Sequence, residues 1–131
     1  MSEQDVVLLR DGFSQLAEEG YESLLPLVHP EFEMTTLPGI AAEPQTYTGK
    51  EGMRRWWESF YEVMDEVQVM PTDFRDAGDG LVVVVATLRA RGQSSGLEVA
   101  QNTFLLVHIR GEQMRRIEFF QSLDEALDAA G

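Results

Sequence analysis

The segment from Leu97 to Ser122 constrains the fold of this chain more than any other. It holds two stretches rich in β-branched, aromatic and long aliphatic side chains, separated by the dipeptide Gly111-Glu112. This pattern predicts a long β-hairpin. A two-residue, glycine-led type II′ turn would pair Arg110 with Gln113, and that pairing fixes which side chains share a face of the sheet.

A regular hairpin in this register has two faces of different character. The first face mixes polar and charged groups with large apolar ones: Gln101, Thr103, Leu105, Val107, Ile109, Met114, Arg116, Glu118 and Phe120. The second face carries Asn102, Phe104, Leu106, His108, Arg115, Ile117 and Phe119. Because ligand sites combine apolar area with a few polar groups, the first face is predicted to line a pocket.

Size and composition indicate one domain spanning residues 1–131. A chain of 131 residues can bury a core without disulfides or metal, and the absence of cysteine excludes thiolate catalysis and cysteine-ligated zinc. The net charge of −13 disfavours nucleic acid and anionic membranes as partners. The acidic residues are scattered along predicted helix surfaces, so we interpret them as solubilising.

No targeting or membrane segment is expected. The first residues, MSEQDVVLLRDGF, lack the basic region, long apolar run and cleavage site of a secretion signal. No apolar stretch approaches the roughly 20 residues of a membrane-spanning helix. We therefore expect a cytoplasmic protein.

Hydrophobic periodicity predicts an α+β order of elements. We expect helices at 3–19 and 21–29, a strand at 30–37, a covering loop at 36–48, a helix from Thr48 to about Glu66, strands at 68–78, 81–92, 97–110 and 113–122, and a helix at 123–130 capped by Ser122. Pro71 places its strand near an edge of the sheet, and the four valines at 82–85 predict a strand covered on both sides. The helix from Thr48 carries an apolar stripe that should pack on the sheet: Met53, Trp56, Trp57, Phe60, Met64 and Val67.

This order, with particular motifs in it, resembles the NTF2-like superfamily and, within it, the SnoaL-like proteins. The motifs are the strand start His29-Pro30-Glu31-Phe32-Glu33, the helix start with Tyr47, Gly49, Glu51, Gly52, Met53, Arg54, Trp56 and Trp57, the strand start Ser95 to Val99, and the chain end Glu125 to Gly131. The resemblance covers essentially the whole chain. It implies an NTF2-like cone, in which a curved antiparallel sheet wraps around helices and leaves a central pocket.

The resemblance also implies a homodimer formed through the sheet. The second face of the hairpin agrees with this, because Phe104, Leu106, Ile117 and Phe119 would otherwise form a large exposed apolar patch.

The enzyme classes of the family match this sequence only in part. The oxyanion-donating tyrosine of ketosteroid isomerases corresponds to Phe13, and their catalytic aspartate falls among Thr35, Thr36 and Leu37. The acid of limonene-type epoxide hydrolases corresponds to Glu118, but only Arg89 could partly replace their Arg-x-Asp pair. SnoaL-type cyclases pair a last-strand acid with a histidine, and in the regular register His108 lies on the opposite face from Glu118.

Glu118 and Arg116 are the candidate catalytic residues. A carboxyl enclosed by Phe120, Leu105 and the tryptophan helix would be a general acid with a raised pKa, and Arg116 would orient a ligand oxygen. Alternatively, the two side chains form an ordinary ion pair on the sheet.

The predicted ligand pocket combines aromatic and polar side chains from four segments. Its members are Phe13, Tyr47, Trp56, Trp57, Phe60, Gln101, Thr103, Leu105, Val107 and Phe120. The tryptophan helix could equally be core, and Gln101 and Thr103 could equally be rim residues. His29 and the nearby Glu31 and Glu33 lack a metal-binding pattern, so no metal or cofactor is expected.

Two functions remain open. The first is a cofactor-independent isomerase, cyclase or hydrolase acting by acid–base chemistry on a small apolar carbonyl or hydroxyl compound. The second is a non-catalytic domain that binds a small hydrophobic molecule. A third possibility is a dimeric scaffold with a vestigial pocket.

Overall fold

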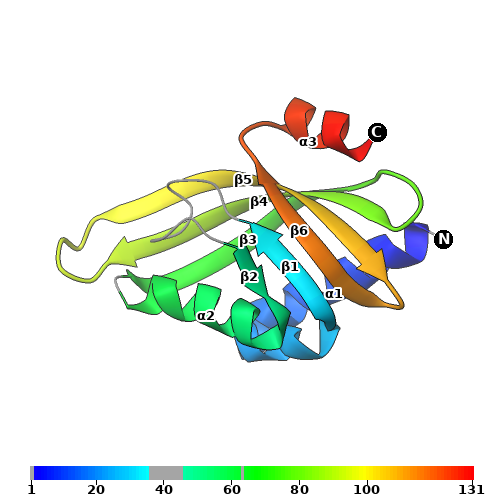
Figure 1. Ribbon diagram of the computed structural model, residues 1–131. Helices are drawn as coiled ribbons and strands as arrows, with labels where there is room; N and C mark the ends of the chain where they lie inside the picture. The colour runs from blue at the N-terminus through cyan, green and yellow to red at the C-terminus, as the bar shows by residue number, and fades with distance from the viewer. Residues whose placement is uncertain (1, 36–45, 63) are drawn as a thin grey trace.

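The computed structural model of the chain describes residues 2–35, 46–62 and 64–131 (Figure 1). The elements are, in order, α1 (Ser2–Glu19), the 3₁₀ helix η1 (Tyr21–Leu27), β1 (Val28–Thr35), β2 (Thr46–Thr48), α2 (Gly49–Tyr61), β3 (Met64–Asp76), β4 (Leu81–Gly92), β5 (Glu98–Arg110), β6 (Gln113–Phe120) and α3 (Leu123–Ala130). The predicted α+β class is confirmed. Most of the predicted covering loop, residues 36–45, lies outside the described residues.

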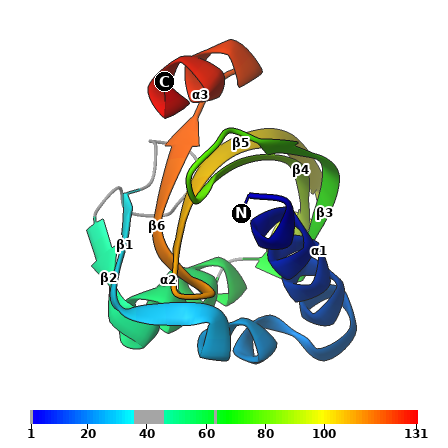
Figure 2. The ribbon, with the colours of Figure 1, turned by 90° about the vertical axis from the view of Figure 1, so that its right-hand side faces the viewer.

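The strands form one strongly curved sheet in the order β2-β1-β6-β5-β4-β3 (Figure 2). From β3 to β6 it is an antiparallel meander, as predicted, and β3 lies at the edge. The expectation of a purely antiparallel sheet is wrong at one junction, because β1 pairs parallel with β6. The meander returns β6 to the side of β1 in the same direction, which makes the sheet mixed.

The helices cover opposite sides of this sheet. α1 and α2 close the concave side, whereas α3 lies on the convex side (Figure 2). The main core fills the concave side, where Leu9, Phe32 and Val107 are almost fully buried. None of the described helices is both long and apolar enough to cross a membrane.

The valine strand β4 is covered on both sides, as predicted. Val82 and Val84 belong to the main core, whereas Val83 packs with Leu106 and Ala126 beneath α3. All three valines are 0% exposed. The four-residue apolar run therefore reflects two separate packing layers.

Two predicted helix ends were wrong. His29 does not end a helix, because the second helical segment is a 3₁₀ helix that stops at Leu27, and His29 lies in β1. The tryptophan helix stops at Tyr61, because Met64 already pairs with Gly92 across β3 and β4. In both places the chain enters a strand before the point where the hydrophobic pattern predicted the helix to end.

The last hairpin has the predicted turn length but a different turn and a different register. Arg110 does pair with Gln113, and both turn residues have positive φ, 59° at Gly111 and 62° at Glu112, which is the type I′ rather than the type II′ conformation. A β-bulge then interrupts the ladder, because Ile109 pairs with Met114 while His108 pairs with Arg116. Arg115 is the extra residue.

The bulge exchanges the faces of β6. Beyond it, Ile117 and Phe119 face the concave side with Leu105 and Val107, and Glu118 pairs with Leu106 on the convex side. Burying an Ile or Phe side chain is worth roughly 1.5–3 kcal/mol, whereas burying Arg116 and Glu118 instead would be costly.

The predicted apolar second face was therefore wrong. Of its four apolar residues, Ile117 and Phe119 lie on the concave side of the sheet. Leu106 is 1% exposed beneath α3, and Phe104 is half-buried on the convex side.

Candidate functional site

A small cavity lies between α1, α2 and the concave face of the sheet. The volume open to the centre of a water-sized sphere is about 60 Å³. The lining residues are Leu9, Gly12, Phe13, Leu16, Leu24, Leu27, Met34, Met53, Trp56, Trp57, Val69, Leu88, Thr103, Leu105, Met114, Ile117 and Phe119. They come from both helices, η1 and five strands, so the cavity is a property of the whole fold.

The chemistry of this cavity is apolar. No acidic or basic side chain is among its described lining residues. Thr103 contributes a hydroxyl, which donates to the carbonyl oxygen of Ala86 at 3.0 Å. The lining can therefore hold an apolar molecule, but it offers no charged group for proton transfer.

Aromatic rings form one wall of the cavity. The rings of Trp56 and Trp57 meet edge to face at 5.0 Å, and the ring of Phe119 lies 5.9 Å from that of Trp56. Adjacent residues of α2 thus both face the sheet, and their rings fix each other's orientation.

A larger open hollow of about 850 Å³ adjoins the cavity, between α1, α2 and the ends of β3 and β4. Leu16, Trp57 and Val69 line both spaces and so form the wall between them. On the hollow side, the ring of Tyr21 stacks on that of Trp57, with centroids 6.0 Å apart and an interplanar angle of 10°. Burial raises the pKa of the Tyr21 hydroxyl, and the carboxylates of Glu58 and Glu22 raise it further.

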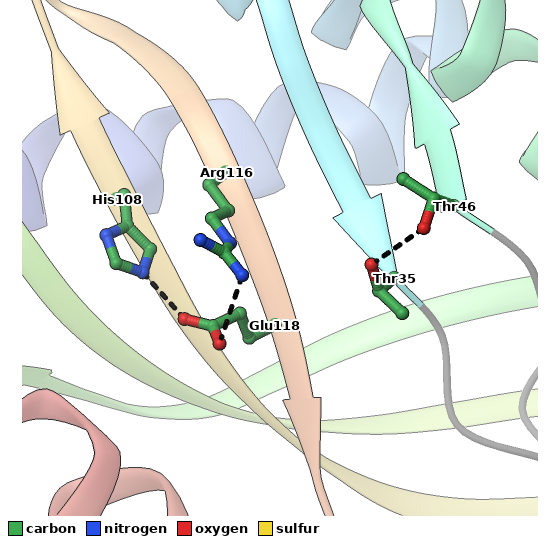
Figure 3. Close-up of polar contacts among 5 residues, drawn as sticks. All are labelled: Thr35, Thr46, His108, Arg116 and Glu118. Atoms are coloured by element: carbon green, nitrogen blue, oxygen red, sulfur yellow. Dashed lines mark hydrogen bonds and ion pairs between the residues drawn. The ribbon is translucent and has the colours of Figure 1, made fainter.

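The two candidate catalytic residues lie together on the convex face. Glu118 Oε1 is 2.8 Å from His108 Nε2, and Glu118 Oε2 is 3.7 Å from Arg116 Nη2 (Figure 3). The ion pair with Arg116, which the sequence left as an alternative, is present. Farther along the same face, the hydroxyls of Thr35 and Thr46 share a hydrogen bond of 3.1 Å between β1 and β2 (Figure 3).

This placement corrects the prediction that Glu118 is enclosed beside Leu105. The bulge puts Glu118 on the opposite side of the sheet from the cavity lining and brings it to His108, which the regular register had kept apart. The side chains of His108 and Glu118 are 33% and 29% exposed, so water partly solvates the pair.

The predicted pocket residues are divided among several locations. Phe13, Trp56, Trp57, Thr103 and Leu105 line the cavity. Val107 is buried in the adjoining core, Tyr47 is buried against the start of α2 near Gly52, and Gln101 is exposed. Phe120 packs on the convex side near α3. The side chain of Phe60 lies outside the described residues.

Sequence reasoning missed Met114, Ile117 and Phe119 as one continuous wall. A signal was present, because these apolar residues of β6 are spaced three and then two apart, with two consecutive arginines in the longer gap. A spacing of three in an otherwise alternating strand marks an inserted residue. Sequence reasoning also did not predict Leu9 and Leu16 as cavity residues, although they lie with Phe13 on the apolar face of α1.

No group of three or more His, Cys, Asp or Glu side chains that could hold a metal ion occurs among the described residues.

Comparison with known proteins identifies the family. The SnoaL-like domain model matches residues 9–117. No curated protein matches the chain. Among solved structures, an NTF2-like protein from Burkholderia thailandensis E264 is 15% identical with a TM-score of 0.79, and 96% of each chain is covered.

Two further structures are similar in fold. TerC co-crystallised with polyporic acid is 16% identical with a TM-score of 0.76, covering 94% of this chain and 97% of that chain. A Jannaschia sp. CCS1 protein named for its likeness to SnoaL-type polyketide cyclases is 17% identical with a TM-score of 0.68, covering 95% of this chain and 92% of that chain. At these identities the likeness establishes the fold alone.

Proposed function

Because this chain belongs to the SnoaL-like domain family, we propose that it binds a small, largely apolar molecule in the cavity between α1, α2 and the sheet. The observation that carries the proposal is the uncharged, aromatic-rich lining of that cavity. The co-crystal of TerC with polyporic acid supports it, because a protein of similar fold was crystallised with a small molecule.

The same lining favours binding over catalysis. General acid–base chemistry needs a titratable group within hydrogen-bond reach of the reacting atom. The described cavity lining offers none, and Glu118 lies across the sheet. We therefore propose that a ligand in this cavity is held without being protonated or deprotonated by the described side chains that line it.

The size of the cavity limits the ligand and suggests its route. A dry apolar cavity of about 150 Å³ binds benzene, so we expect the space of about 60 Å³ to widen when it admits a ring. The wall formed by Leu16, Trp57 and Val69 separates it from an open hollow. We propose that the ligand enters through this wall.

The test is a titration with indane, an apolar bicyclic hydrocarbon, monitored by intrinsic fluorescence. The chain's two tryptophans both line the cavity, so their emission reports its occupation. We expect saturable binding. Leu105→Phe should weaken it about tenfold, equivalent to roughly 1.4 kcal/mol, because the added ring occupies the cavity.

Leu106→Phe is the matched control, since the same change one residue along β5 enlarges a side chain beneath α3. It should leave the indane affinity within about twofold of wild type, whatever it does to stability. A linear fluorescence response, or an equal loss of affinity in both variants, would reject the proposed site.

A second candidate function is acid–base catalysis at the convex face. The 2.8 Å contact between His108 and Glu118 favours it, because a carboxylate that holds an imidazole can set its tautomer for proton transfer. Unchanged turnover by Glu118→Gln, once a substrate is identified, would exclude it. A cytoplasmic location and a homodimer remain predictions.

A further inference from the structure

We infer that the molecule bound in this cavity carries a hydrogen-bond acceptor oxygen, such as a ketone carbonyl, and that this oxygen accepts from the indole N–H of Trp57. This inference rests on the proposed binding function and narrows its ligand class. It concerns a single atom, Nε1 of Trp57.

The indole N–H of Trp57 has no hydrogen-bond acceptor among the described residues. The residue is 4% exposed, and its Nε1 is fully buried. A buried donor normally has an acceptor, and an exception calls for an explanation such as a binding role. A ligand oxygen that reaches this N–H when the wall moves would supply the missing acceptor.

The position of Trp57 links the free N–H to the ligand. Its side chain lines both the cavity and the open hollow, so it lies in the wall that must move when the cavity widens. Tyr21 stacks on the same ring and Trp56 meets it edge to face. These ring contacts place Trp57 in the wall between the two spaces, where an entering molecule passes it.

The hydroxyl of Thr103 also lines the cavity, but it cannot donate a hydrogen bond to the ligand. Thr103 donates its hydrogen to the carbonyl of Ala86, so towards a ligand its oxygen can only accept. A ketone oxygen brought into this apolar space therefore needs an indole N–H to replace the hydrogen bonds it loses on leaving water. A hydrocarbon of the same shape has no such need. Trp56 and Trp57 both line the cavity, and of the two Trp57 also lines the hollow from which the ligand enters.

The experiment compares 1-indanone with indane by calorimetry on wild type and Trp57→Phe, a variant that keeps an aromatic ring but removes the N–H. One hydrogen bond of ordinary strength corresponds to about three- to tenfold in affinity. We expect Trp57→Phe to weaken 1-indanone by that factor relative to indane. Trp56→Phe removes the other buried indole N–H of the lining, and the inference requires that it leave the ratio of the two affinities unchanged. Leu106→Phe, beneath α3, is the control away from the cavity.

A second measurement does not depend on the variant folding. The infrared carbonyl stretch of 1-indanone bound to wild type should lie below its position in a hydrocarbon solvent, since hydrogen bonding weakens the C=O bond. A stretch at the hydrocarbon-solvent position would overturn the inference. The inference would also be overturned if Trp56→Phe changed the ratio of the two affinities, or if neither tryptophan variant changed it. Absence of binding by both compounds would instead reject the proposed function itself.

Discussion

The orientation of the last hairpin depends on a few residues near its turn. Gly111 and Glu112 both adopt positive φ, and a few residues later Arg115 is inserted with no counterpart in β5. This insertion decides that Ile117, and not Glu118, faces the cavity. The candidate catalytic acid is thus moved to the other side of the sheet by one unpaired residue.

Glu112 should be replaceable by a better turn residue. Its φ of 62° lies in the left-handed region, which costs a residue with a β-carbon roughly 1 kcal/mol or more. We expect Glu112→Gly to raise the free energy of unfolding by about 1 kcal/mol, measured by urea denaturation.

Gln113→Gly provides the control for that change. Gln113 begins the regular strand β6, where glycine destabilises by roughly 0.5–1 kcal/mol. Equal destabilisation by the two substitutions would show that Glu112 is not strained in solution.

At the scale of elements, α3 covers the outer of the two packing layers that the sheet separates. Ala126 of α3 is 0% exposed and packs on Val83 and Leu106. These two residues lie on the convex side of β4 and β5, and the concave side of the same strands faces the main core. This short helix therefore protects the outer face of the central strands. Its stability depends on how its first turn is capped.

The cap of α3 gives a prediction at this scale. The hydroxyl of Ser122 accepts from the backbone N–H of Glu125 at 3.1 Å. Ser122→Ala should lower the free energy of unfolding by about 1 kcal/mol and speed hydrogen exchange of the α3 amides.

Ser122→Asp should restore most of that stability, because aspartate caps helices as well as serine. If exchange in α3 were as slow in Ser122→Ala as in wild type, the cap would contribute nothing.

At the scale of the whole molecule, we predict that two copies of the chain associate. The resemblance predicted a homodimer through the sheet, and the convex face still presents a surface around Asn102, whose side chain accepts a hydrogen bond from Thr87 at 3.1 Å. We expect light scattering to give twice the 14.8 kDa mass of the chain.

Asn102→Glu should dissociate this dimer, because a two-fold interface near this position would bring the two new charges close together. Gln101→Glu is the matched control. Gln101 is also exposed but points to the other side of β5, so the dimer should persist. A monomeric wild type would contradict the prediction outright.

The sequence by itself determined the features that depend on one segment. The helical period of α1, the serine cap of α3, the buried character of β4 and the two-residue turn at Gly111-Glu112 were predicted from neighbouring residues, and the family followed from motifs along the chain. The helical period, the cap and the turn depend on interactions within a few residues, and the valine run of β4 is contiguous in sequence.

The tertiary structure alone decided the register of β6, the parallel pairing with β1 and the end of α2. Each depends on segments far apart in sequence, because a strand takes the register that buries its apolar residues against distant helices, even when this requires a bulge. The same choice made Ile117 and Phe119 cavity residues and moved Glu118 to the other side of the sheet.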